Sequence, residues 1–254
     1  MGTERIVVAA VAGIALGLSV FAVLRPMPEA PAEGAAVTDE AFGSKVKSYL
    51  MDNPHVLFEA AASYEDQERQ NAEKKLQASV AENRDKLTKL PGSFYAGNPD
   101  AKITVVEFFD YHCGYCKAAM PTLMELVEKN KDVRVRFMEF PILRPESEIA
   151  SRAAIAADAQ GKYLPLHRAM MSAAGVLTED RIFAIAQEVG LDVEKLKADM
   201  KSEKTGKILD AHHSFAEKVG FDGTPGLIVG DKAMTGWSEE LIKQYIAEQR
   251  KQKG

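Results

Sequence analysis

Cysteine is scarce in this chain, whose 254 residues include only two, Cys113 and Cys116. So small a number argues against the disulfide framework that stabilises small secreted domains. Only Gly114 and Tyr115 separate the two, and closing so short a loop removes little entropy from the unfolded chain. The pair is therefore expected to serve chemistry rather than scaffolding.

An excess of positive charge is also lacking, since the formal net charge is -5 and the pI about 5.7. Proteins that bind nucleic acid usually carry a basic patch, so no nucleic-acid partner is expected. Internal repeats are absent too. With 46% apolar residues, the chain can form one sizeable core plus accessory elements, or two small domains.

An unbroken apolar run occupies residues 6–24, between Arg5 and Arg25, and is long enough to cross a bilayer. Two interpretations stay open. An uncleaved anchor is preferred, because the run exceeds the usual apolar region of a signal peptide. Cleavage after export is the alternative, and small residues at 30–32 and 34–36 would permit it.

The following segment is rich in helix formers. Phe42, Val46 and Tyr49 recur at the spacing of one helical face, and Asn53-Pro54 predicts the start of a second, longer helix. No heptad is sustained, which argues against a long coiled coil. An amphipathic arm cannot bury its apolar stripe alone. We expect self-association, with packing on the following domain as the alternative.

Strands and helices alternate in the rest of the chain. Residues 103–109 are apolar on both faces, which predicts a fully buried strand, and 133–140 alternate as in a half-buried one. The other expected elements are a helix from Cys113, a helical block over about 146–220, a short strand ending at Gly230, a hairpin partner at 232–236 and a closing helix at 238–250.

Two separated motifs carry a family resemblance. Residues 106–116 read Val-Glu-Phe-Phe-Asp-Tyr-His-Cys-Gly-Tyr-Cys, and Gly-Thr-Pro at 223–225 precedes an apolar strand. With the helical block between them, they resemble the DsbA family of thioredoxin-fold thiol:disulfide oxidoreductases over about 94–250. Gly-Tyr, Glu-Phe-Pro-Ile-Leu at 139–143 and Tyr-Leu-Met-Asp-Asn-Pro at 49–54 resemble its oligomeric, ScsC-like members. Gly-Tyr is also similar to the isomerase DsbC.

The resemblance implies an α/β thioredoxin fold with a helical insertion, preceded by a helical arm. The apolar run at residues 6–24 adds a transmembrane or signal helix before that arm. Three parts are expected: an anchor or signal segment with linker at 1–37, a helical oligomerisation arm at 38–92, and a DsbA-like thioredoxin domain at 93–254 with its insertion at about 146–220.

Disulfide exchange requires a thiolate, and a thiol of pKa about 8.5 is only slightly ionised at neutral pH. If Cys113 lies at the N-terminus of its helix, free N–H groups and the helix dipole favour the thiolate. Cys113 is then the exposed nucleophile. Cys116, one turn further on, resolves the mixed disulfide. Gly114 and Tyr115 are expected to set the redox potential.

Three polar residues flank the cysteines. Burial of Glu107 within its strand should raise the pKa of its carboxyl. The resemblance places it beneath the cysteines, where it would relay the proton of Cys116; a structural carboxylate is the alternative. His112 either adds positive charge near the sulfur or has no effect on it. Asp110 is expected to be a capping or turn residue.

Substrate binding is assigned to Thr224, Pro225, Tyr115 and His112. The resemblance implies a cis Thr224-Pro225 bond opposite the cysteines, whose neighbouring backbone binds an extended substrate segment; the residues alone predict an ordinary turn. Gly226 stands where many relatives have Ala, which would loosen the groove.

Metal binding is the rival chemistry. Two cysteines supply half of a tetrahedral zinc site, and His212 and His213 point in different directions on a helix, so no structural zinc is expected. Copper(I) is softer and could accept Cys113 and Cys116 alone. No cofactor beyond the redox-active disulfide is otherwise expected. The histidines interpreted as surface or packed helix residues are His55, His167, His212 and His213.

Three functions stay open. The favoured one is a reduced, homo-oligomeric disulfide isomerase, or mixed isomerase and oxidase, because several sites facing one misfolded substrate help an isomerase. It would act on exported cysteine-containing proteins in the periplasm, tethered by residues 6–24 or released by cleavage, with a membrane thiol-disulfide redox partner. The others are a monomeric oxidase and a copper(I)-binding protein.

Overall fold

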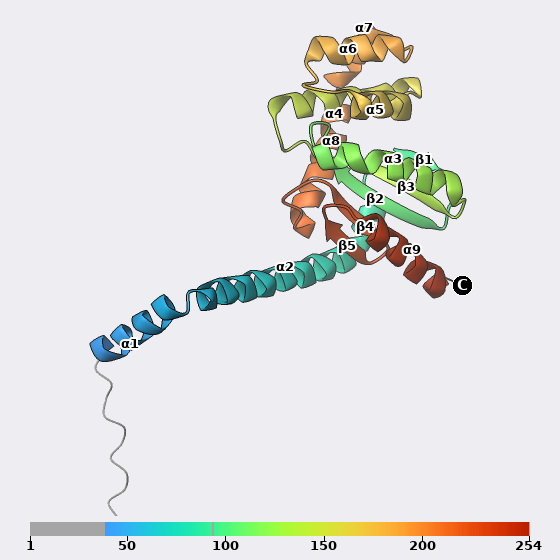
Figure 1. The fold of residues 1–254 in the computed structure, drawn as a ribbon. Coiled ribbons are helices and arrows are strands. Elements are labelled where there is room, and N and C mark those ends of the chain that lie inside the picture. The colour runs from blue at the N-terminus through green and yellow to red at the C-terminus, as the bar shows by residue number, and fades with distance from the viewer. Residues whose placement is uncertain (1–38, 93, 254) are drawn as a thin grey trace, which may run out of the picture. The chain divides into compact units, whose positions relative to one another are not determined.

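The computed structural model describes residues 39–92 and 94–253 (Figure 1). The chain divides into two compact units, residues 1–61 and 62–254. The expected anchor or signal helix at 6–24 lies outside the described residues. Among the helices that are described, none combines the length and apolar character needed to span a membrane. The predicted boundaries at 37 and 92 stay predictions.

Two helices account for the described part of the first unit: α1 (Asp39–Asp52) and the start of α2 (His55–Lys89). Helix α1 ends where the backbone N–H and the side-chain amide of Asn53 both donate to the Tyr49 carbonyl, at 2.9 and 3.0 Å. Pro54 lacks an N–H, which favours the predicted break between the helices. The large apolar side chains exposed in this unit are Phe42, Val46, Tyr49, Met51, Leu57 and Phe58.

A five-stranded sheet of order β1-β3-β2-β4-β5 forms the centre of the second unit. The strands are β1 (Tyr95–Gly97), β2 (Ile103–Phe109), β3 (Val133–Glu139), β4 (Gly226–Val229) and β5 (Lys232–Thr235). Strands β2 and β3 are parallel and the other pairings antiparallel. Helix α3 (Gly114–Lys129) makes the crossover that parallel neighbours require. The sequence did not predict β1, which is too short to show alternation.

Both faces of this sheet are covered. Helix α3, α9 (Glu239–Lys253) and the insertion pack over the face that carries Val105 and Phe109. The opposite face packs against Leu76, Val80 and Leu87 of α2. Strand β3 is therefore buried on both faces, and the prediction of a half-buried strand is wrong, because α2 covers the side where solvent was expected.

The insertion between β3 and β4 is helical throughout, as predicted. It comprises α4 (Pro145–Ala157), the 3-10 turn η1 (Asp158–Gln160), α5 (Tyr163–Ser172), α6 (Glu179–Glu188), α7 (Val193–Met200) and α8 (Glu203–Val219). The hairpin of β4 and β5 and the closing helix α9 also confirm the predicted elements. Strand β2 thus delivers the cysteines to the start of α3, beside the insertion and the turn that precedes β4 (Figure 1).

Candidate functional site

Cys113 caps the N-terminus of helix α3. Its backbone is extended (φ -77°, ψ 115°), and its sulfur accepts the Cys116 backbone N–H at 3.4 Å. The pKa of the Cys113 thiol falls to about 6, chiefly because the Cys116 side chain hydrogen-bonds the sulfur, with further bonds from the Cys116 and Tyr115 backbones. Cys113 is therefore mainly thiolate at neutral pH, as its position at the helix end predicts.

Cys116 has the opposite properties. It is wholly buried, and burial, followed by the Cys113 hydrogen bond and the Glu107 charge, raises the pKa of its thiol far above the ordinary value. Both cysteines are free, so this is the dithiol form. An ionised outer sulfur beside a protonated inner one is the arrangement that attack followed by resolution requires.

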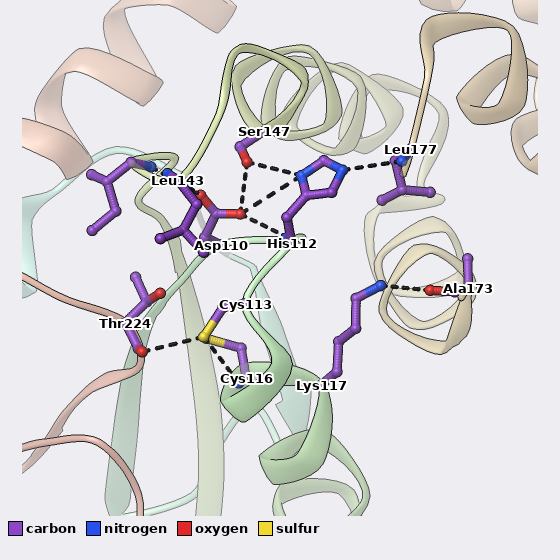
Figure 2. Close-up of polar contacts among 11 residues, drawn as sticks. Asp110, His112, Cys113, Cys116, Lys117, Leu143, Ser147, Ala173, Leu177 and Thr224 are labelled. Atoms are coloured by element: carbon purple, nitrogen blue, oxygen red, sulfur yellow. Dashed lines mark hydrogen bonds and ion pairs between the residues drawn. The ribbon is translucent and has the colours of Figure 1, made fainter. Parts of the chain in front are cut away.

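The turn before β4 lies against the outer sulfur. The Thr224-Pro225 peptide bond is cis, as the resemblance implied. In the thiol form, the Cys113 S–H donates to the Thr224 carbonyl at 3.2 Å (Figure 2). Because this turn covers the sulfur, Cys113 retains only 5% of its surface and is less exposed than predicted. A substrate that reaches Cys113 must therefore also meet Thr224.

Glu107 is wholly buried on β2, and neither carboxyl oxygen has a hydrogen-bond partner among the described residues. Burial, then the charges of Cys113 and Glu139, raise the pKa of Glu107 to about 8. The prediction of a raised pKa is confirmed. A buried carboxyl that couples electrostatically to both cysteines can hold a proton near neutral pH.

Figure 2 shows how Asp110 fixes the loop before the cysteines. One carboxylate oxygen accepts the His112 N–H and the Ser147 hydroxyl, each at 2.7 Å. The other accepts the backbone N–H groups of Ile142 and Leu143 at 2.9 and 3.0 Å. Asp110 is thus the predicted turn residue, and it also binds the segment after β3 and helix α4.

His112 extends the same network. Its Nε2 accepts the Leu177 N–H at 3.0 Å, so the ring proton lies on Nδ1, which is 2.9 Å from the Ser147 hydroxyl. The imidazole is neutral in this arrangement, and burial lowers its pKa. The ring points toward the insertion and away from the Cys113 sulfur (Figure 2). His112 therefore fastens the loop, and this geometry gives no positive charge beside the thiolate.

Tyr115 lies between the cysteines at the start of α3 and is 72% exposed. An exposed aromatic ring two residues along the chain from Cys113 is suited to contact an incoming polypeptide. Of the predicted substrate-binding residues, Thr224, Pro225 and Tyr115 thus lie around Cys113 or next to it in the chain, whereas His112 points elsewhere.

A second buried carboxyl, Glu139 at the end of β3, was not predicted as a site residue. It accepts the Tyr163 hydroxyl at 2.7 Å, and the Tyr111 hydroxyl lies 3.4 Å from it. Burial raises the pKa of Glu139 to about 8. The sequence shows the motif Glu-Phe-Pro-Ile-Leu that contains Glu139. It does not show that Tyr163 is the partner of Glu139, because Tyr163 lies in the insertion, far along the chain.

The buried histidines serve packing, as predicted. His167 lies 2.9 Å from the Tyr111 hydroxyl through Nδ1. His212 accepts the Glu139 N–H at 3.1 Å and its Nε2 lies 2.8 Å from the Pro91 carbonyl. Within residues 39–92 and 94–253, no group of three or more His, Cys, Asp or Glu side chains gathers as a metal site would require.

Comparisons with known proteins agree with this architecture. Residues 104–247 match the DSBA-like thioredoxin domain family, and residues 40–71 match the family described as the copper resistance protein ScsC N-terminal domain. These matches confirm a thioredoxin-like α/β fold with a helical N-terminal region.

Solved structures also resemble this chain, and two of them serve as examples. A thioredoxin-like oxidoreductase from Silicibacter pomeroyi is 40% identical, with a TM-score of 0.64 over 66% of this chain and 98% of that chain. ScsC from Proteus mirabilis in a transitional conformation is 27% identical, with a TM-score of 0.61 over 86% of this chain and 97% of that chain.

Among curated proteins, the Na(+)/H(+) antiporter NhaA 1 of Salinispora arenicola is 25% identical over 142 residues, which are 55% of this chain and 22% of that protein. The chain thus spans about a fifth of the length of this relative.

Proposed function

Because this chain belongs to the DSBA-like thioredoxin domain family, we propose that it is a thiol:disulfide oxidoreductase acting through Cys113 and Cys116. One observation carries the proposal. The pKa of the Cys113 thiol is lowered to about 6, whereas that of Cys116, one helical turn away, is strongly raised. The redox-active disulfide of this pair is the only redox group that the chemistry needs.

In the proposed reaction, the Cys113 thiolate attacks a substrate disulfide. One substrate sulfur becomes bonded to Cys113, and the other leaves as a thiolate. The Cys113 charge, which helps to raise the pKa of Glu107, is thereby lost. The pKa of Glu107 then falls, so Glu107 can give its proton to the substrate thiolate that has left, and the resulting carboxylate accepts the Cys116 proton. The Cys116 thiolate attacks the Cys113 sulfur, forming the intramolecular disulfide and releasing the reduced substrate.

Isomerisation requires that the substrate leave Cys113 before Cys116 attacks the mixed disulfide. If the freed substrate thiolate attacks a second disulfide of the substrate, a different substrate thiolate leaves; when that thiolate attacks the substrate sulfur bonded to Cys113, Cys113 leaves as the thiolate and the substrate disulfides are rearranged. The exposed Tyr115 and the Thr224-Pro225 turn are proposed to hold the substrate backbone during this exchange. The proposed activity is isomerase, or mixed isomerase and oxidase, with monomeric oxidase as the alternative.

Self-association is proposed through the exposed apolar side chains of the first unit. Phe42, Tyr49 and Phe58 are 57%, 58% and 76% exposed, and such residues in a helix favour burial against a second copy. The match of residues 40–71 to the ScsC N-terminal domain supports this assignment. A periplasmic location, a tether at residues 6–24, exported cysteine-containing substrates and a membrane redox partner complete the proposal.

The test compares Phe42→Glu/Tyr49→Glu/Phe58→Glu with a control, Ser44→Glu/Ser48→Glu/Asn71→Glu, which adds the same charge at exposed polar positions. Mass is measured by light scattering, beside refolding of a scrambled-disulfide substrate and oxidation of a reduced one. The apolar-face variant should become monomeric and lose isomerisation while oxidation persists. Isomerisation by a monomer at the wild-type rate would contradict the oligomeric mechanism.

Copper(I) binding is the second candidate, because two free thiols lie close together at the start of α3. Titration of the reduced protein with copper(I), against a competing chelator, tests it. Binding that disappears in Cys113→Ser would support the candidate, whereas unchanged binding in that variant would remove it.

A further inference from the structure

A cavity of about 200 Å³ lies on the face of the sheet turned away from Glu107. It is separate from the dithiol: Thr104 and Val106 line it from the first half of β2, whereas Cys113 follows the end of that strand. The polar side chains that matter in its lining are Arg84, Thr88, Lys102, Thr104, Arg134 and Arg136. Helix α2, β2 and β3 supply most of them.

Strand register explains why cations gather there. Thr104 of β2 pairs with Arg134 of β3, and Val106 pairs with Arg136. Side chains alternate along a strand, so the valines at 133 and 135 enter one core while the two arginines share the opposite face. Tyr95 of β1 pairs with Arg136 and stands over Arg134, whose guanidinium carbon lies 4.6 Å from the ring centre.

Arg136 is 4% exposed and has no carboxylate partner among the described residues. Its terminal nitrogens donate to the carbonyls of Leu87, Leu90 and Gly92 at 2.9, 2.6 and 2.9 Å. Its Nε has no partner within the part of the chain that the structure describes. A buried guanidinium that is solvated only by neutral carbonyls, with one N–H unused, favours an anion.

The charge balance points the same way. Arg134 donates to the Thr104 hydroxyl at 2.9 Å and to the Pro99 carbonyl, which are both neutral. No Asp or Glu lines the cavity in the described ranges. The C-terminal carbonyls of α2 contribute roughly half a negative charge, which is less than the charge of Arg136 alone. The lining therefore keeps a positive excess.

We propose that this cavity binds a phosphate group, either free inorganic phosphate or the phosphoryl end of a small molecule. Guanidinium groups present paired N–H donors that match phosphate oxygens, and the Thr104 hydroxyl, which accepts from Arg134, can donate as well. The volume suits a small group, because it is several times the ~30 Å³ share of one water in the liquid yet below the ~300 Å³ of the smallest typical organic-ligand pockets.

The test measures calorimetric binding and thermal unfolding of the whole protein with inorganic phosphate and, separately, glycerol phosphate, at constant ionic strength set with chloride. Arg84→Gln and Arg134→Gln are the variants. Arg168→Gln is the matched control, since it removes the same charge from an exposed position on α5. Arg136 is left intact because it holds three backbone carbonyls.

Saturable binding to the wild type and to Arg168→Gln, weakened about tenfold or more in Arg84→Gln and Arg134→Gln, is expected. A ligand that binds only the folded protein should also raise its unfolding temperature. Binding of glycerol phosphate alone would identify the phosphoryl end of a larger molecule as the source. No saturable binding of either compound, or equal affinity in all variants, would overturn the proposal.

Discussion

At the scale of single residues, the chemistry depends on the unequal environments of two sulfurs. The thiolate of Cys113 is stabilised chiefly by the Cys116 side chain, and also by Thr224 and by backbone N–H groups at the start of α3. The sequence predicted both roles, because position relative to a helix end is a local property. It did not predict how completely the Thr224 turn covers Cys113, which depends on a contact across 111 residues.

Replacing Cys116 should therefore change the pKa of the Cys113 thiol. In Cys116→Ala, loss of the hydrogen bond between the two side chains should raise the pKa of Cys113 above about 6. Because the backbone donors of α3 remain, the pKa should stay below that of an ordinary thiol. The pH profile of thiolate absorbance and of the alkylation rate measures both. An unchanged midpoint would show that the Cys116 side chain does not stabilise the thiolate.

The buried carboxyl of Glu107 should make stability depend on pH. Its folded-state pKa of about 8 lies above the ordinary value of 4.5, so between these values the native protein binds more protons than the unfolded chain. Stability from this group is present below pH 4.5 and declines as pH rises through about 8.

Glu107→Gln removes the loss of stability that comes from ionising Glu107. The free energy of unfolding of this variant should therefore exceed the wild-type value by an amount that grows with pH and reaches on the order of 3 kcal/mol. Urea unfolding of both proteins from pH 5 to 8.5 gives the difference at each pH, in which the contributions of groups that do not interact with Glu107 cancel. A difference independent of pH would assign Glu107 an ordinary pKa.

At the scale of secondary-structure elements, local patterns predicted where most helices and strands lie, but not what covers them. The alternation at 133–140 indicated a half-buried strand because Arg134 and Arg136 are polar. Arg136 is instead buried, since it binds carbonyls at the C-terminal end of α2. Glu139 was missed for the same reason: its partner Tyr163 comes from a different element.

The start of β4 offers a test of packing. The buried ring of Phe221 occupies the space beside Gly226, and a Cβ at Gly226 would lie 2.7 Å from it. Gly226→Ala should therefore destabilise the protein by about 1–3 kcal/mol. The same Gly226→Ala change should cost less stability when it is made in Phe221→Leu, so the double variant should lie closer to Phe221→Leu than Gly226→Ala lies to the wild type. Denaturant unfolding measures all four proteins, and additive effects would contradict the proposed clash.

At the scale of the whole molecule, helix α2 is part of the core of the second unit as well as of the expected arm. Its residues Leu76, Val80 and Leu87 lie in the core of the second unit, so the packing alternative holds for this part of the helix. The sequence left that choice open because an apolar stripe does not identify its partner. The self-association proposed for the first unit concerns other residues, Phe42 to Phe58.

Two truncations should separate these regions. A chain beginning at residue 62 keeps the whole second unit and should unfold cooperatively, with Cys113 reactivity unchanged. A chain beginning at residue 91 exposes the sheet face that α2 covers and leaves Arg136 without its Leu87 and Leu90 carbonyls. Circular dichroism and thermal unfolding should show it severely destabilised. Equal stability of the two would show that α2 adds nothing to this core.

The hydrogen bonds of His112 with Ser147 and Leu177 matter for the newly made chain. Its partners Ser147 and Leu177 lie 35 and 65 residues further along the sequence, so a chain that emerges from its N-terminus exposes both cysteines before it can order their loop. During that interval Cys113 has the pKa of an ordinary thiol, so only a small fraction of it is thiolate. The larger thiolate fraction of the folded protein is therefore expected only after α3 and the turn at Thr224 have formed around the sulfur.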